Sequence, residues 1–345
     1  MTRIRAQQED DAHRVRYQEP KEGRFPNRPI TIGRWFFGGW KTAVPGERLS
    51  TVASRQDSDR YHRTVPAVLA VVFLCLGPVV SLRAADAESM ADRTLRRIVE
   101  RQQELFAEAA QQGEKLDESN FRQQVQSITH EYELLLRNNP SLAMGYAAYG
   151  YLLSKIDQRK EATSMLLKAN QLDPNIALVK NQLGNLLAED GKPLQAAPYF
   201  ISAIKLEPNQ PLYHYQLGTL LAEARENFLK TGEWTRASLD RAMHHAFQRA
   251  AELAPDRFEF AYRHAESFYD LEQPDWAGAL QAWGALEEKA PTPIERQTMR
   301  LHAANVCIKI GKLAHARALI ETVDEPKLQG QKDRLLPQLA EAEKK

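Results

Sequence analysis

The feature of this sequence that most constrains its fold is a short pattern that recurs every 34 residues. Each copy contains a glycine, a pair of leucines two residues later, and a proline. The glycines are Gly150, Gly184 and Gly218, and the prolines are Pro140, Pro174 and Pro208. Self-similarity at a period of this size is the signature of a repeat architecture, in which each unit packs against its neighbours. The sequence therefore predicts an array of repeats in preference to two separate globular domains.

Two successive stretches of the chain carry the pattern most fully. The matching residues are Tyr146, Tyr149, Gly150, Leu153, Ala162, Leu166, Ala169 and Pro174, followed by Leu183, Gly184, Leu187, Ala196, Phe200, Ala203 and Pro208. Their types and offsets resemble those of the tetratricopeptide repeat (TPR), a hairpin of two helices in 34 residues. The resemblance implies an all-α fold: a right-handed superhelical solenoid of antiparallel helix pairs, preceded here by a signal or anchor helix.

The small residues of the pattern have a packing role in such a hairpin. Glycine and alanine let two helix backbones approach to the short end of the usual spacing of about 8–10 Å. We therefore expect the small residues to lie where the two helices of a pair cross. These residues are Gly150, Gly184, Gly218, Ala162, Ala196, Ala169 and Ala203.

The array is predicted to cover residues 140–326, with about five units, and to end in a capping helix over 327–345. Its rhythm breaks in the third unit, where Pro208 and Pro255 are separated by more than one period. The extra sequence, near 225–238, contains Phe228, Leu229 and Trp234. Two interpretations are open. The insertion is either an elongated hairpin whose aromatic residues pack back on the helices, or an apolar surface for a partner or a second copy.

Residues 88–139 are predicted to form two amphipathic helices ahead of the array. Apolar residues recur at spacings of three and four in both, for example Phe121, Val125 and Ile128 in the second. The second helix is expected to end before Pro140, because proline disfavours helical geometry in the residue before it. This pair resembles a degenerate repeat.

An uncharged apolar segment comes before these helices. Residues 65–82 follow Arg60 and Arg63, are rich in valine and leucine, and lead into a stretch of small residues. This is the layout of an export signal, although the run is also just long enough to span a membrane. Residues 64–87 are thus predicted to be a cleaved signal peptide or a membrane anchor, with a buried soluble helix as the remaining alternative. Both leading alternatives predict an exported array, periplasmic or anchored with the array on the periplasmic side.

Residues 1–63 are rich in arginine, glutamine and proline and lack helical periodicity. Such a composition predicts a disordered segment. One interpretation is a cytoplasmic tail ahead of an anchor. The other is that the natural start lies closer to residue 65.

Composition and motifs argue against several classes of function. The net charge is +1, so the strongly basic character of a nucleic-acid-binding domain is missing. Two cysteines, Cys75 and Cys307, provide neither a disulfide framework nor a cysteine-based zinc site. The adjacent His244 and His245 point about 100° apart on a helix and do not form a shared metal face. No phosphate-binding or hydrolase motif occurs, so we expect no enzyme, no metal and no cofactor.

The candidate binding residues come from the resemblance. In TPR proteins the first helices of successive units line a concave groove, and fixed positions on these helices contact the ligand. Carried onto this chain, those positions are Ala147, Tyr151, Lys155, Asn181, Asn185, Glu189, Tyr215, Thr219, Tyr262 and Asn305. Asn181 and Asn185 lie four residues apart, and each amide can both donate to and accept from a peptide backbone.

The sequence therefore predicts a non-enzymatic scaffold that binds a peptide or protein partner of unknown identity. The alternative is a structural protein that self-associates through the insertion around Trp234, as a homo-oligomer. Function has to be argued from a site, and the sequence does not name the partner.

Overall fold

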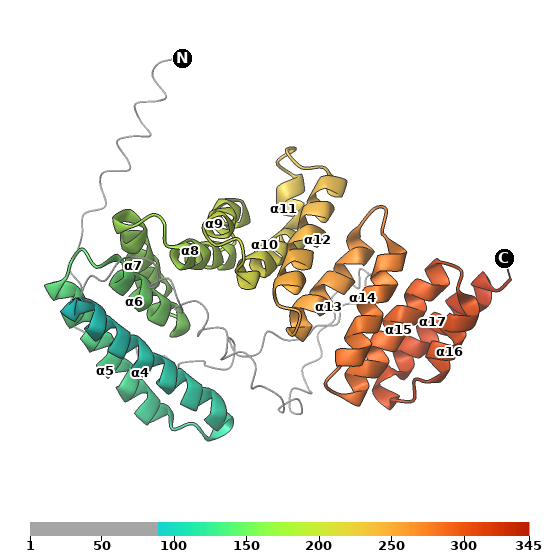
Figure 1. Cartoon of the computed structure of the whole chain (residues 1–345), viewed down its shortest axis with the longest axis horizontal. Coiled ribbons are helices and arrows are strands. Elements are labelled where there is room, and N and C mark those ends of the chain that lie inside the picture. The colour runs from blue at the N-terminus through green and yellow to red at the C-terminus, as the bar shows by residue number, and fades with distance from the viewer. Residues whose placement is uncertain (1–88, 345) are drawn as a thin grey trace, which may run out of the picture. The chain divides into compact units, whose positions relative to one another are not determined.

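The computed structural model describes residues 89–344, and within them the chain is helical, without strands (Figure 1). Short turns join the helices into successive pairs. The pairs are α4 (Met90–Gln112) with α5 (Glu118–Asn138), α6 (Ala143–Lys155) with α7 (Arg159–Leu172), α8 (Ala177–Glu189) with α9 (Pro193–Leu206), α10 (Pro211–Glu223) with α12 (Arg236–Leu253), α13 (Phe258–Ser267) with α14 (Trp276–Lys289), and α15 (Pro293–Lys309) with α16 (Leu313–Glu321). A final helix, α17 (Gln329–Ala342), follows.

The turn inside several pairs depends on a residue in the left-handed region. Gly191 and Gly311 have φ of 72° and 75°, and Asp157 occupies the equivalent turn of α6 and α7 with φ of 60°. Glycine adopts this conformation without the steric cost that a Cβ brings. The Gly191 N–H also donates to the Ala188 carbonyl at 3.0 Å, which satisfies one of the last carbonyls of α8.

The helices of each pair approach most closely at the repeated glycines. A Cβ added to Gly150 would lie 2.7 Å from Leu166 Cγ, and one added to Gly184 would lie 2.9 Å from Phe200 Cε1. At Gly218 the Phe247 ring would be 2.8 Å away. Ala162, Ala169, Ala196 and Ala203, on the second helices, are fully buried. The spacing of small residues in the sequence thus corresponds to tight contacts between paired helices.

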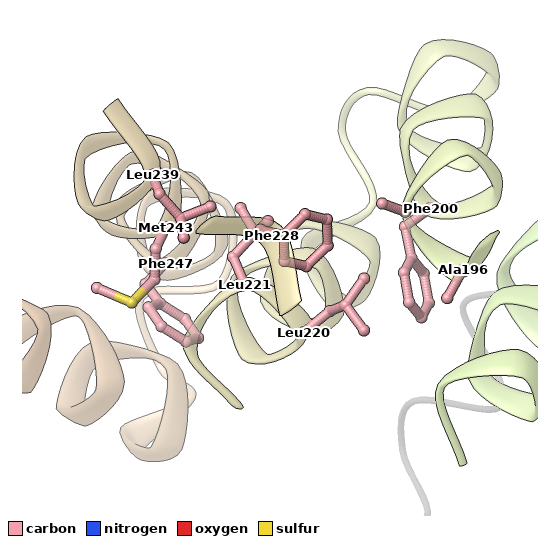
Figure 2. Close-up of a cluster of buried hydrophobic side chains, with 9 residues drawn as sticks. Ala196, Phe200, Leu220, Leu221, Phe228, Leu239, Met243 and Phe247 are labelled. Atoms are coloured by element: carbon pink, nitrogen blue, oxygen red, sulfur yellow. The ribbon is translucent and has the colours of Figure 1, made fainter. Parts of the chain in front are cut away.

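The insertion in the third unit forms α11 (Arg225–Leu229) and the turn that leads into α12. Phe228 is buried, and its ring meets that of Trp234 edge to face at a centroid distance of 6.3 Å. Figure 2 shows Phe228 between the side chains of α12 and those of α9, in the same hydrophobic cluster as Leu221 and Phe200. The aromatic residues of the insertion therefore pack back on the helices, as the elongated-hairpin interpretation predicts.

At the carboxyl-terminal end, α17 packs one face against the last pair. Leu335 and Leu339 are buried with Ile320, whereas Leu336 is 40% exposed. A terminal helix with one apolar and one polar face closes the core of a repeat array against water.

The sequence-based division into parts stays a prediction, and two of its parts, residues 1–63 and 64–87, lie outside the described residues. Across residues 89–344, no helix combines the length and the apolar character that crossing a membrane requires.

Candidate partner-binding site

All ten predicted binding residues lie on the first helices of their pairs, α6, α8, α10, α13 and α15. Their surroundings differ from unit to unit. In α6, Ala147 is buried, Tyr151 is half-buried and Lys155 is exposed. The Lys155 ammonium lies 5.3 Å from the centre of the Tyr151 ring, within the range of a cation–π contact. Tyr151 and Lys155 thus present one combined surface, and Ala147 contributes only to the core.

The two asparagines of α8 have different environments. Asn185 is half-buried, while Asn181 is fully buried. Neither the oxygen nor the nitrogen of the Asn181 amide has a hydrogen-bond partner in the described part of the chain. Leaving such a group unpaired costs about 1–3 kcal/mol. The sequence pattern predicts two similar amides on one helix face. In the structure, only the Asn185 amide is accessible to a ligand.

Glu189, at the end of α8, is held by the first unit. One of its carboxylate oxygens lies 3.0 Å from a guanidinium nitrogen of Arg159 in α7. Burial raises the pKa of Glu189, and the charge of Arg159 acts in the opposite direction. This contact ties the second unit to the hairpin of the first.

Tyr215 joins the first helices of the third and fourth units. Its hydroxyl donates to Glu259 Oε1 at 2.8 Å, and its ring centroid lies 4.7 Å from that of Phe260. Burial raises the pKa of Tyr215, and the neighbouring Glu259 carboxylate raises it further. One turn along α10, the Thr219 hydroxyl donates to the Tyr215 carbonyl and therefore has its proton engaged within the helix.

An aromatic cluster joins the fourth and fifth units. The His302 ring, from α15, stacks on Trp283 of α14 at a centroid distance of 4.1 Å. Tyr262 meets Trp283 edge to face at 5.4 Å, and the Tyr269 hydroxyl lies 3.3 Å from the His302 carbonyl. Burial lowers the pKa of His302 to about 4. Asn305 is half-buried, and its side chain opposes the rise that burial causes in the pKa of Tyr269.

Sequence reasoning named Tyr262 and Asn305 as binding candidates, but it did not name Tyr269, Trp283 or His302 among them. Tyr269 and His302 lie 33 residues apart and come from different helices, so no local periodicity links them. Only the unusual number of aromatic residues between positions 258 and 302 hinted at the cluster.

An ionic network anchors the insertion, and no sequence motif predicts it. Arg225 Nε lies 2.9 Å from Asp240 Oδ1 in α12, and another nitrogen of the same guanidinium lies 2.9 Å from Asp270 Oδ1. Arg236 also pairs with Asp240, which is almost fully buried. Because Asp270 follows α13, Arg225 connects the third unit to the fourth.

Two expectations about reactive side chains can be compared with the structure. Cys307 is buried with apolar neighbours, and burial raises the pKa of its thiol, as expected for a packing residue. Among residues 89–344, no group of three or more histidine, cysteine, aspartate or glutamate side chains is arranged to hold a metal ion.

No family model and no curated protein matches this chain. Similar solved structures include YrrB, a TPR protein with an unusual peptide-binding site, at 18% identity and a TM-score of 0.47, over 62% of this chain and 98% of YrrB. PilF of Pseudomonas aeruginosa aligns at 16% identity and a TM-score of 0.48, over 73% of this chain and 98% of PilF. PilW, a type IV pilus biogenesis factor, aligns at 12% identity and a TM-score of 0.46, over 73% and 100%. At these low values the likeness carries no inference about what this chain binds.

The chain's own geometry identifies the repeat. Helix pairs follow one another along the described chain, and the glycines that recur every 34 residues lie against Leu166, Phe200 and Phe247 of the partner helices. This is the arrangement that the resemblance to the tetratricopeptide repeat predicts. Residues 89–344 are thus an all-helical array of helix pairs, whose third unit carries the α11 insertion and whose last pair is covered by α17.

Proposed function

We propose that this protein is a non-enzymatic TPR scaffold that binds an extended segment of a partner protein along its first helices. The proposed surface, which we call the first-helix face, carries Tyr151, Asn185, Tyr215, Thr219 and Asn305. One observation carries the proposal. The Tyr215 hydroxyl of α10 reaches Glu259 of α13, so side chains on successive first helices are direct neighbours.

Neighbouring side chains on successive helices allow one ligand to contact several units. An extended segment offers a backbone donor or acceptor at each residue, and the amides of Asn185 and Asn305 can pair with both kinds of group. Aromatic rings such as Tyr151 and Tyr215 add apolar contact area at a small cost in side-chain entropy. Recognition is therefore proposed to be spread over units one to five.

Site-specific photo-crosslinking tests this assignment. A photoreactive phenylalanine analogue replaces Asn185 or Thr219 on the first-helix face in cells that express the full chain. The matched control carries the same analogue at Leu167, which is 47% exposed on the second helix α7. We expect partner adducts at Asn185 and Thr219 and none at Leu167. Adducts at Leu167 alone would contradict the assignment.

The array is proposed to act outside the cytoplasm, in the periplasm or anchored to the membrane. This part of the proposal rests on residues 65–82 and their basic flank. A fusion of alkaline phosphatase to the carboxyl terminus tests it, because this enzyme needs disulfide bonds that form outside the cytoplasm. Activity that depends on residues 65–82 is expected, and an inactive, stable fusion would refute export.

A further inference from the structure

A second potential site lies away from the first-helix face, in a cleft between α12 and α14 whose floor is formed by α13. The cleft has a volume of about 1070 Å³. Ala261 and His264 of α13 line its floor with Phe268, which follows α13, and with His244 of α12. Gly278, Ala282 and Ala285 of α14 line the opposite wall. This volume is slightly above the usual range for ligand pockets, about 300–1,000 Å³.

Beside the cleft, the fourth unit has a small residue where the first and third units have a ring. The position four residues before the repeated glycine holds Tyr146 in the first unit and His214 in the third, both buried, and Lys180 in the second. The fourth unit has Ala261 there, four residues before Ala265. A large ring is thus replaced by a methyl group, which leaves space beside α13.

The proline carbonyl at the start of the unit also has a different hydrogen-bond donor in the fourth unit. In the third unit, His214 Nε2 lies 2.8 Å from the carbonyl of Pro208. The equivalent carbonyl in the fourth unit belongs to Pro255, and it accepts instead from Lys289 Nζ of α14 at 3.0 Å. The carbonyl is satisfied from the far wall of the cleft, so no large side chain is needed at Ala261.

The residue just before the repeated glycine also varies between units, and in the fourth unit it is a histidine. It is Tyr149 in the first unit, Leu183 in the second, Leu217 in the third and His264 in the fourth. The His264 ring packs against His244 and Phe268, with ring centroids 5.0 and 5.2 Å away. Three aromatic rings therefore form one floor, and two of them carry nitrogen atoms.

The hydrogen bonds of Ser267 fix the protonation of His244. The Ser267 hydroxyl donates its single proton to the His264 carbonyl at 2.6 Å. At 2.8 Å from His244 Nδ1 it can then only accept, so Nδ1 carries the hydrogen and Nε2 is an acceptor. His244 Nε2 has no hydrogen-bond partner among residues 89–344, and it is not fully buried, so a ligand can reach it. Burial lowers the pKa of both histidines, that of His264 to about 4, so both rings are uncharged at neutral pH.

We propose that this cleft binds a segment of a partner protein that inserts one aromatic side chain with an N–H or O–H group, tryptophan or tyrosine. The ring lies on the floor of His244, His264 and Phe268, and its donor bonds His244 Nε2. The cleft exceeds the volume of one side chain, and the exposed Gln281 on its rim offers an amide to the adjoining backbone. These features favour a peptide over a free aromatic molecule.

Two small aromatic compounds, bound to the full chain, test whether a ligand N–H group donates to His244 Nε2. Indole carries an N–H, and 1-methylindole has nearly the same shape without it. With ring-¹⁵N-labelled histidine, we expect indole to shift the His244 signals and 1-methylindole to bind about 3- to 10-fold more weakly. His244→Phe keeps a ring and removes the acceptor, so it should abolish the difference. Equal affinities in the wild type, or a difference that persists in H244F, would overturn the proposal.

Two further measurements test where the ligand binds and whether the ligand is a peptide. Ala285 is exposed on the cleft wall, so Ala285→Phe should fill the cleft without disturbing the core. We expect this variant to bind indole about tenfold more weakly. Unchanged indole binding would refute the site. Acetyl-Gly-Ala-Trp-Ala-Gly-amide should bind more tightly than indole, and Gln281→Ala should weaken the peptide alone. A peptide no tighter than indole would overturn the peptide assignment. Tyr262 and Tyr215 are not involved, so these results are independent of the first-helix face.

Discussion

Arg225 lies 2.9 Å from Asp240, a carboxylate that is almost fully buried at the start of α12. The pair connects the inserted helix α11 to the second helix of its own unit, and the same guanidinium continues to Asp270 after α13. A charge removed from water in this way depends on its partner.

We expect Arg225→Met to destabilise the protein by about 2–4 kcal/mol, because Asp240 would keep only Arg236 as a partner. Urea denaturation followed by circular dichroism measures the change. The control is Arg225→Met combined with Asp240→Leu, which removes both buried charges and should recover most of the loss. A double variant as unstable as the single one would show that the ion pair is not the cause.

The repeated glycines allow a matched comparison within helices. Gly218→Ala places a methyl group 2.8 Å from the Phe247 ring, whereas Gly284→Ala, in α14, meets no atom within 4 Å. Alanine is favoured over glycine in both helices by about 1 kcal/mol, so the difference isolates packing. G218A should be less stable than G284A by about 1–3 kcal/mol, judged from denaturation midpoints. Equal stabilities would mean that α10 and α12 can move apart at no cost.

His302 should make stability depend on pH. Its pKa is about 4 in the folded chain against an ordinary 6.5, so the unfolded chain binds a proton first as the pH falls. The stability this provides is complete above pH 6.5 and is lost between pH 6.5 and about 4, by an amount on the order of 2–3 kcal/mol. His302→Phe preserves the stack on Trp283 and should flatten this part of the profile. An unchanged slope in denaturation measured from pH 7 to 4 would contradict the role of His302.

A variant of Trp234 can show whether this residue packs within its own hairpin or mediates self-association. Since its ring meets Phe228 inside the hairpin, Trp234→Ala should destabilise the protein by about 1–3 kcal/mol, less than for a fully buried tryptophan. Light scattering should give the same mass for variant and wild type. A variant of unchanged stability but lower mass would instead favour the homo-oligomer alternative.

Much of the architecture could be read from the sequence because the packing requirements are local. Where two helices of one hairpin cross, only small residues fit, so Gly184 and Ala196 recur at a fixed spacing that the sequence displays directly. The helix before Pro140 and the turn at Gly191 follow from backbone geometry alone, through the restriction before proline and the left-handed φ that glycine allows.

Side-chain environments were less accessible to sequence reasoning. Asn181 and Asn185 look alike in the sequence, yet one is fully buried and the other is half-exposed. Their difference arises from neighbouring helices, whose arrangement around α8 no spacing rule describes. The same holds for Arg225 and Asp270, 45 residues apart, which meet only because α11 and the end of α13 come together.

By itself, the sequence predicted an all-helical repeat array and showed where the 34-residue spacing is interrupted. It also showed that the apolar run 65–82 precedes the array. These properties follow from periodicity and backbone geometry, which act over a few residues. Only the tertiary structure decided that the insertion packs inward, that the aromatic residues of α13, α14 and α15 form one cluster, and that a cleft opens beside Ala261. These properties depend on which side chains from distant helices meet, and the energy of such contacts is absent from any local stretch of sequence.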